Sequence, residues 1–188
     1  MILKYKPEID SLRAISVIAV IIYHAKIYLF GNLALQGGYF GVDIFFVISG
    51  YLITSIIYYD LIENKFSFKN FYLKRARRIL PALLLTIIIS LILSWFSLMP
   101  SAFIDYSKSV LYSLGFISNY YFYFSGLEYG AVSGLLKPLL HTWSLGIEEQ
   151  FYIIFPLILA LILKYNAYWV LRVILIITFV FSSSLKFL

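Results

Sequence analysis

Arg13 and His24 are the two residues of this chain from which a reaction is most readily inferred. Both lie in the first long apolar segment, predicted to span a membrane over residues 12–30. A charged Arg inside a bilayer helix costs roughly 2.5–3.5 kcal/mol on insertion scales, so such residues usually serve a function. At about 100° and 1.5 Å per residue, the two side chains share one helix face about 16 Å apart. The segment therefore presents a permanent cation near one membrane surface and, deeper in, a titratable imidazole suited to act as a general base.

Asp43 opens the second predicted span, residues 41–59, shortly after the first span ends. We expect His24 about 9 Å below the outer end of its helix. A His24–Asp43 contact would then fix the imidazole tautomer and raise its basicity. An N-terminal cap favoured by the helix dipole explains Asp43 equally well. A purely structural role is the less favoured alternative for His24.

Residues 74–78, Lys-Arg-Ala-Arg-Arg, form a basic run immediately before the third apolar segment. Arg75 and Arg78 are three residues apart on one helix face, and guanidinium forks suit a pyrophosphate or ribose phosphate. The same run is also typical of a cytoplasmic anchor under the positive-inside rule. The two interpretations are compatible.

Residues 141–150, His-Thr-Trp-Ser-Leu-Gly-Ile-Glu-Glu-Gln, are the densest polar cluster in an apolar element. Offsets of three and four place His141, Ser144 and Glu148 on one face. Side chains stacked along one helix rarely form a hydrolase triad, so we expect them, with Glu149, to line a polar cavity. The alternative is that Glu148 or Glu149 pairs with an arginine such as Arg13 or Arg78.

The composition identifies a polytopic, all-α membrane protein without a soluble domain. Hydrophobic residues make up 62% of the 188 residues, charged residues 13%, and the mean hydropathy is +0.92. Soluble domains are about 45–50% apolar and about 25% charged. With no cysteine, disulfides, thiolate metal sites and a cysteine nucleophile are excluded. We expect no metal. We also expect no nucleic-acid partner, because the distribution of the net charge of +6 follows membrane topology.

A membrane-spanning helix needs about 20 mostly apolar residues. The chain offers about six candidates, residues 12–30, 41–59, 79–98, 109–124, 138–163 and 168–187. The fourth candidate is short and polar in places, which indicates a tilted span or a re-entrant segment. Gly37, Gly38, Gly41 and Gly50 are expected to allow close approach between helices.

Charge distribution predicts the orientation. Residues 60–78 carry six basic side chains against two acidic ones, whereas residues 31–40 carry no charge. By the positive-inside rule the first of these segments is cytoplasmic, and alternation places the N-terminus in the cytoplasm as well.

Four motifs in order resemble those of one family. Arg13 and His24 match an Arg-x10-His motif, and residues 38–54 match a second signature. Arg75 to Arg78 resembles an Arg-x-x-Arg motif, and residues 141–152, HTWSLGIEEQFY, resemble a fourth. Together they are similar to acyltransferase family 3, the OafA/YrhL-like integral membrane O-acetyltransferases.

The resemblance implies an enzyme that transfers an acyl group, usually acetyl, from cytoplasmic acyl-CoA to a hydroxyl of a cell-surface or lipid-linked carbohydrate. Lipopolysaccharide O-antigen, exopolysaccharide and peptidoglycan are acceptors of this kind. Arg13 and His24 would be the essential pair, and Arg75 and Arg78 would bind the donor, acetyl-CoA or another acyl-CoA. The resemblance also implies a bacterial inner (plasma) membrane.

The family's domain has about ten spans, so residues 1–188 are expected to be its N-terminal part. A C-terminal half or a second copy would then be needed to cover polar faces in lipid. Two other classes stay open: an inactive, truncated remnant, and a membrane transporter with an Arg/His/Glu ion path. A membrane acyltransferase built around a His and an Asn fits the ordered motifs less well.

Overall fold

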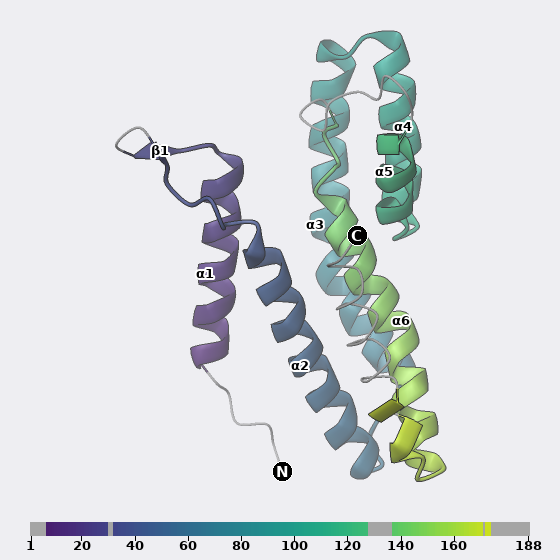
Figure 1. The fold of residues 1–188 in the computed structure, drawn as a ribbon. Coiled ribbons are helices and arrows are strands. Elements are labelled where there is room, and N and C mark those ends of the chain that lie inside the picture. The colour runs from purple at the N-terminus through teal and green to yellow at the C-terminus, as the bar shows by residue number, and fades with distance from the viewer. Residues whose placement is uncertain (1–6, 30–31, 128–136, 171, 174–188) are drawn as a thin grey trace.

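The computed structural model of the chain describes residues 7–29, 32–127, 137–170 and 172–173. The described part contains six labelled helices and one pair of very short strands (Figure 1), and residues 168–170 and 172–173 are helical as well. In chain order they are α1 (Pro7–His24), β1 (Tyr28–Leu29), β2 (Asn32–Leu33), α2 (Phe40–Ile62), α3 (Phe68–Ser97), α4 (Pro100–Leu114), α5 (Ser118–Leu127) and α6 (Thr142–Lys164). The predicted all-α membrane bundle is confirmed, with the β1–β2 hairpin as a small addition in the α1–α2 connection.

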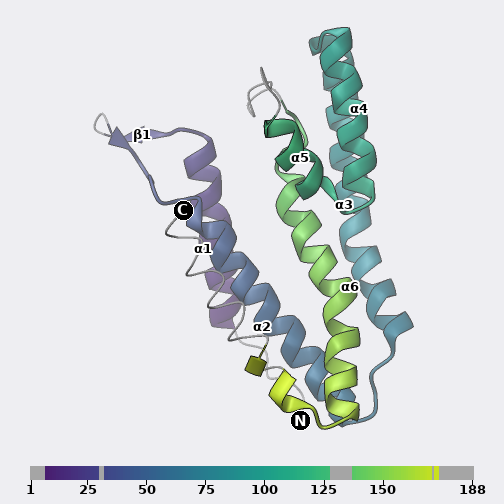
Figure 2. The same ribbon diagram turned by 45° about the vertical axis from the view of Figure 1, so that its right-hand side comes forward.

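The helices form two arms. Figures 1 and 2 show α1 and α2 as an antiparallel pair in one arm and α3 to α6 in the other. In both views the arms meet near the C-terminal ends of α2 and α6 and diverge towards the β1–β2 hairpin and the α3–α4 turn. Helix α2 still contacts the start of α6, where the Phe46 and Trp143 ring centres lie 6.3 Å apart.

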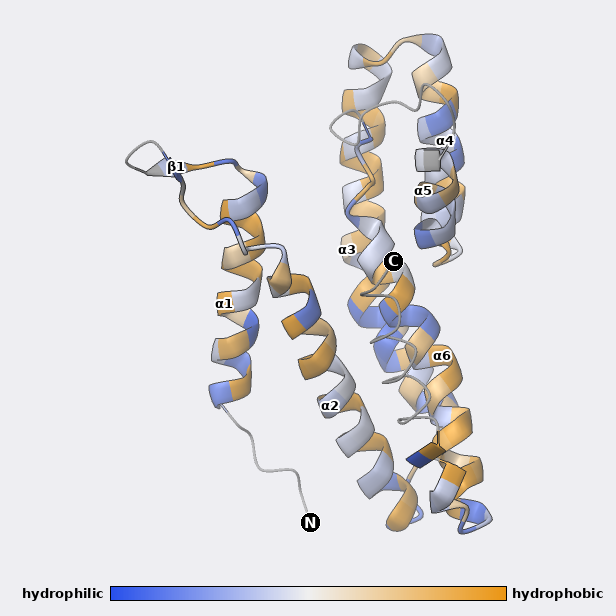
Figure 3. Ribbon diagram, viewed as in Figure 1, coloured by the Kyte–Doolittle hydropathy of each residue, from blue (hydrophilic) through white to orange (hydrophobic). Residues whose placement is uncertain are grey.

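Three helices of the described part are long and apolar enough to cross a membrane: α2, α3 and α6. They correspond to the second, third and fifth predicted spans. Figure 3 shows hydrophobic residues along most of their length, with hydrophilic residues gathered in the lower part of α3. The sixth predicted span, residues 168–187, lies mostly outside the described residues.

The prediction for the first span was wrong at both ends, and α1 (Pro7–His24) is not among the three described helices long and apolar enough to cross a membrane. Helix α1 ends at His24, and Lys26 adopts a left-handed backbone with φ 49°, which is typical of a helix terminus. The Lys26 amide donates to the Tyr23 carbonyl at 3.2 Å, which closes the last turn. His24 therefore lies at the very end of its helix, not about 9 Å below the end of a longer one.

The third and fourth predicted spans also need correction. Helix α3 begins at Phe68, where the Ser67 hydroxyl caps it by accepting from the Asn70 amide at 3.4 Å, so the basic run lies inside the helix. Residues 109–124 are not one span, because α4 ends at Leu114 and Phe116 turns the chain with φ 55°. The 15-residue α4 and 10-residue α5 are each shorter than the ~20 residues of a span, and they form a helical hairpin.

Glycine allows α1 and α2 to pack at backbone distance, as the sequence predicted for Gly38 and Gly41. A Cβ on Gly38 would lie 2.4 Å from the Ala19 carbonyl oxygen, and one on Gly41 would lie 2.5 Å from that of Ser16. The prediction was wrong for Gly50, where no described atom lies within 4 Å of an added Cβ. Gly38 and Gly41 therefore set the separation between α1 and α2.

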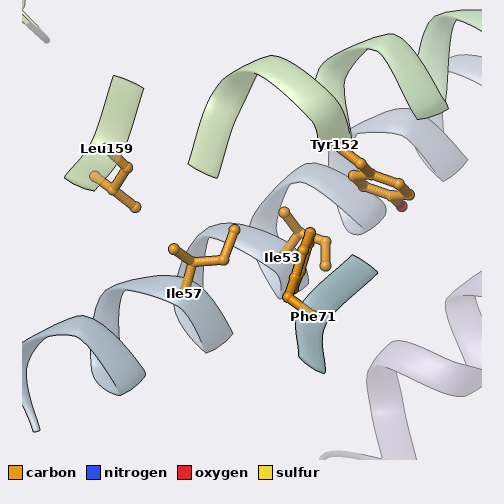
Figure 4. Packing of buried hydrophobic residues seen from close by; sticks show 5 residues of the cluster. All are labelled: Ile53, Ile57, Phe71, Tyr152 and Leu159. Atoms are coloured by element: carbon orange, nitrogen blue, oxygen red, sulfur yellow. The ribbon is translucent and has the colours of Figure 1, made fainter. Parts of the chain in front are cut away.

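Two apolar clusters hold the elements together. In the first, α2 contributes Ile53 and Ile57, α3 contributes Phe71, and α6 contributes Tyr152 and Leu159 (Figure 4). The second gathers residues of α3, α4, α5 and the turn before α6, namely Leu83, Ile87, Tyr106, Phe122 and Leu139. The first cluster ties the three long helices to one another, and the second ties the α4–α5 hairpin to α3.

Candidate functional site

A pocket of about 350 Å³ lies where α1, α2 and the start of α6 meet. It is lined by Ser16, Val17, Val20, Ile21, Gly41, Val42, Phe45, Phe46, His141, Ser144, Leu145 and Glu148. The walls from α1 and α2 are mainly apolar, whereas α6 supplies a hydroxyl and a carboxylate, and its N-cap residue His141 supplies an imidazole. Such a pocket can hold an apolar acyl group beside groups that accept or donate protons.

The polar face predicted for residues 141–150 is on the wall of this pocket. His141, Ser144 and Glu148 all line it, and the Ser144 hydroxyl donates to the His141 carbonyl at 3.1 Å. Glu149 is not among the lining residues. Its side chain is buried, with 7% exposure, and its Oε1 has no hydrogen-bond partner within the described residues.

A second face of the same segment binds the α4–α5 hairpin, and sequence reasoning missed it. Thr142 shares a hydrogen bond of 2.9 Å with Ser113, and its carbonyl accepts from Ser118 at 2.8 Å. Gln150 Nε2 donates to the Phe116 carbonyl at 2.8 Å and to Asn119 Oδ1 at 2.9 Å. The available signal was the spacing of Thr142, Gly146 and Gln150, which repeats every four residues along one helix face.

Gly146 lies at the centre of that second face. A Cβ there would lie 3.2 Å from both Asn119 Oδ1 and the Phe116 carbonyl oxygen. Trp143 extends the contact to the other arm, because its ring meets the Phe46 ring edge-on at 6.3 Å. The start of α6 is thus fixed between the hairpin and α2.

Arg13 and His24 flank the pocket without lining it. The pocket residues of α1, from Ser16 to Ile21, lie between them on the helix. The Arg13 guanidinium lies 5.2 Å from the centre of the Phe45 ring and 4.0 Å from Asp10. His24 is exposed, and its Nδ1 lies 2.9 Å from the Val20 carbonyl oxygen. A carbonyl can only accept a hydrogen bond, so Nδ1 carries the proton and Nε2 of the neutral ring holds the free lone pair.

The expected His24–Asp43 contact is not formed between these described residues. Asp43 is exposed in the first turn of α2, where the helix dipole favours its charge. It is not the cap, because Tyr39 occupies the N-cap position and makes no side-chain cap hydrogen bond. The Val20 carbonyl, and not a carboxylate, orients the imidazole here.

Arg75 and Arg78 lie in different surroundings. Arg75 is partly buried, with its guanidinium 4.5 Å from the centre of the Tyr152 ring and 5.8 Å from that of Phe71. Arg78 is exposed. The Tyr152 hydroxyl in turn donates to Glu148 Oε1.

The alternative pairing of Glu148 or Glu149 with Arg13 or Arg78 is not seen in the described part of the chain. Arg75 is linked to Glu148 through Tyr152, whose ring lies under its guanidinium and whose hydroxyl donates to the carboxylate. Over the described ranges, no three His, Asp or Glu side chains gather as metal ligands would.

Comparison with known proteins agrees with the motifs. A family model described as an acyltransferase domain matches residues 6–188. The chain is 42% identical over 163 residues to the peptidoglycan O-acetyltransferase OatA of Listeria monocytogenes, covering 86% of this chain and 25% of that protein. It is 37% identical over 163 residues to the O-acetyltransferase OatA of Staphylococcus aureus, covering 85% of this chain and 26% of that protein.

The chain therefore spans about a quarter of the length of the curated relatives it matches. No solved structure matches it. The family match covers nearly all 188 residues, and it includes the helices that form the pocket. The chain belongs to acyltransferase family 3, a family of integral membrane acyltransferases.

Proposed function

We propose that the chain is part of a membrane O-acyltransferase that transfers an acetyl group from acyl-CoA to a hydroxyl of a cell-wall carbohydrate. The observation that carries the proposal is the pocket, because residues of three distant segments supply its walls. Its polar wall carries His141 and Glu148, and its α1 wall lies between Arg13 and His24. Two relatives are named O-acetyltransferases, one of them for peptidoglycan, which supports this acceptor class over lipopolysaccharide O-antigen.

The donor is proposed to approach from the cytoplasm. Lys74, Arg77 and Arg78 are exposed in the first turns of α3, where their charges suit the phosphates of CoA. The positive-inside rule places this end of the bundle in the cytoplasm, together with the start of α1. The protein would then reside in the plasma membrane with its β1–β2 hairpin outside.

His24 is proposed to act through Nε2, the nitrogen left free by the Val20 carbonyl. As a general base it takes the proton of the acceptor hydroxyl, whose oxygen attacks the thioester carbonyl carbon. The C–S bond breaks, an ester C–O bond forms, and the CoA thiolate leaves and takes up a proton.

As an acyl carrier, His24 Nε2 itself attacks the thioester and releases the CoA thiolate. The acceptor oxygen then displaces the imidazole from the acyl carbon and loses its proton. Single-turnover reactions without acceptor separate the two routes: mass spectrometry detects acyl-His24 if His24 is the carrier and unmodified His24 if it is a base.

The test is acetyl transfer by the purified full-length protein in detergent, where no membrane potential exists. We expect labelled acetyl-CoA to be consumed and an O-acetylated peptidoglycan fragment to be formed. A transporter with an Arg/His/Glu ion path would form no covalent product in detergent. Absence of acetylated product from folded, full-length protein would contradict the proposal.

A further inference from the structure

We propose that the two arginines of the Arg-x-x-Arg motif have different roles. Arg78 binds the phosphates of the acyl-CoA donor, whereas Arg75 acts through Tyr152 to hold Glu148 at the pocket. Arg75 and Tyr152 are then positioning residues. This inference rests on the proposed acyltransferase function.

The surroundings of the two arginines carry the first step. The Arg75 guanidinium stacks over Tyr152 at 4.5 Å and also faces the Phe71 ring at 5.8 Å. Arg75 is thus partly buried against two aromatic rings, which leaves its guanidinium less open to a phosphate from solution than that of an exposed arginine. Arg78 is exposed one turn further along α3, so its planar fork is available for bidentate phosphate binding.

Tyr152 carries the second step, because it touches both partners. Its side chain is 3% exposed and packs among Ile53, Phe71 and their neighbours in the first apolar cluster. Figure 4 shows the ring beside these two residues. Its face receives Arg75, and its hydroxyl donates to Glu148 Oε1. The ring therefore has one fixed position from which it can orient the carboxylate.

The acidic pair carries the third step. Glu148 lines the pocket, and adjacent Glu149 is buried without a hydrogen bond to its Oε1 from any described residue. Two neighbouring carboxylates in an apolar bundle need a compensating charge and donor. Arg75 brings its charge to this pair through the Tyr152 ring, over which its guanidinium lies at 4.5 Å. Tyr152 supplies the hydrogen-bond donor to Glu148, the carboxylate at the pocket. Removing either partner should therefore alter the pocket and leave the donor site in place.

The test compares kcat and KM for acetyl-CoA in four single variants and one double variant of the full-length protein. Tyr152→Phe removes one hydroxyl and keeps the ring in the core. Arg75→Gln and Arg78→Gln remove one guanidinium each. Tyr72→Phe is the matched control, because the Tyr72 hydroxyl also links α3 to α6. It donates to the Ile153 carbonyl at 2.9 Å, and neither residue lines the pocket.

We expect Tyr152→Phe to lower kcat about tenfold, because Glu148 loses a hydrogen bond to a charged group. Arg75→Gln should lower kcat by a similar factor, because the Tyr152 ring loses the guanidinium that lies over it. Both variants should keep KM for acetyl-CoA within about twofold. Arg78→Gln should raise that KM about tenfold with kcat within about twofold. Tyr72→Phe should leave both constants within about twofold. The double variant Arg75→Gln/Tyr152→Phe should be no slower than the slower single variant, because the two residues act in one chain.

A rise in KM for Arg75→Gln equal to that of Arg78→Gln would overturn the inference, as would an unchanged kcat for Tyr152→Phe. Thermal unfolding of each variant checks that it is folded. If Arg75→Gln does not fold, Tyr152→Phe decides alone. Failure of the proposed function is a separate result, because it would abolish acetyl transfer by the wild-type protein itself.

Discussion

At the scale of single residues, the Val20 carbonyl, and not Asp43 as the sequence suggested, orients the His24 imidazole. It lies 2.9 Å from His24 Nδ1 and fixes which ring nitrogen is free. A backbone carbonyl cannot be found by searching for acidic partners, since every residue has one. The sequence could propose His24 as the reactive group from its place in an apolar segment, but the geometry around its ring depends on where α1 ends.

This geometry predicts a small effect of Asp43→Asn. Because Asp43 is exposed and makes no contact with His24 in the described structure, the rate of acetyl transfer should fall by less than about threefold. Steady-state transfer assays check this. A loss of about a hundredfold or more would instead show that Asp43 orients His24 during the reaction.

At the scale of elements, hydropathy predicted the long apolar helices and missed their ends. The turn that separates α4 from α5 falls inside the window over residues 109–124, whose few polar residues indicated a tilted or re-entrant segment but not the position of the break. The start of α3 was set too late because its basic first turns are not apolar, although Ser67 is a recognisable N-cap. The face of α6 that lines the pocket was predictable, since helical spacing alone determines it.

Gly41→Ala should weaken the α1–α2 pair. The added Cβ would lie 2.5 Å from the Ser16 carbonyl oxygen and 2.8 Å from Val20 Cγ2, so the helices must separate at a cost of about 1–3 kcal/mol. Thermal unfolding in detergent measures the loss of stability. Acetyl transfer should fall as well, because Gly41, Ser16 and Val20 all line the pocket.

Gly50→Ala is the matched control in the same helix. Its Cβ meets no described atom within 4 Å, and alanine favours a helix interior by roughly 0.5–1 kcal/mol over glycine. Its stability should equal or exceed that of the wild type. Equal destabilisation by the two variants would refute the close packing at Gly41.

Gln150→Leu should loosen the α4–α5 hairpin from α6. The variant loses two hydrogen bonds, to the Phe116 carbonyl and to Asn119, and leaves those acceptors unpaired at a cost of about 1–3 kcal/mol. A double-mutant cycle with Asn119→Ala measures the coupling. Strict additivity of the two changes would mean that the pair contributes nothing to the hairpin's position.

At the scale of the whole molecule, the two arms share one pocket, and the distribution of charged residues predicts which end of the molecule faces the cytoplasm.

Residues 1–188 contain no cysteine, so single cysteines can report topology. Gln36→Cys, between β2 and α2, should react with an impermeant maleimide added outside the cell. Lys65→Cys, between α2 and α3, should react only after the membrane is opened. The reverse pattern would invert the proposed orientation and the side from which acyl-CoA enters.

The different surroundings of Arg75 and Arg78 also depend on the packing of the whole molecule. Their spacing placed both on one face of α3, and nothing in the local sequence distinguishes them. The two differ because α6, which is distant in sequence, packs on α3 so that Tyr152 contacts Arg75 and leaves Arg78 exposed. Such contacts depend on helix placement, so sequence patterns can nominate the residues without assigning their roles.

The most direct measurement of the central claim is the initial rate of acetyl transfer from labelled acetyl-CoA to a peptidoglycan fragment, compared between the full-length wild type and His24→Ala. His24 is exposed at the end of α1, so the variant should fold normally. If His24 is the reactive group, its rate should fall by at least about a hundredfold. Transfer by folded His24→Ala at the wild-type rate would contradict the account.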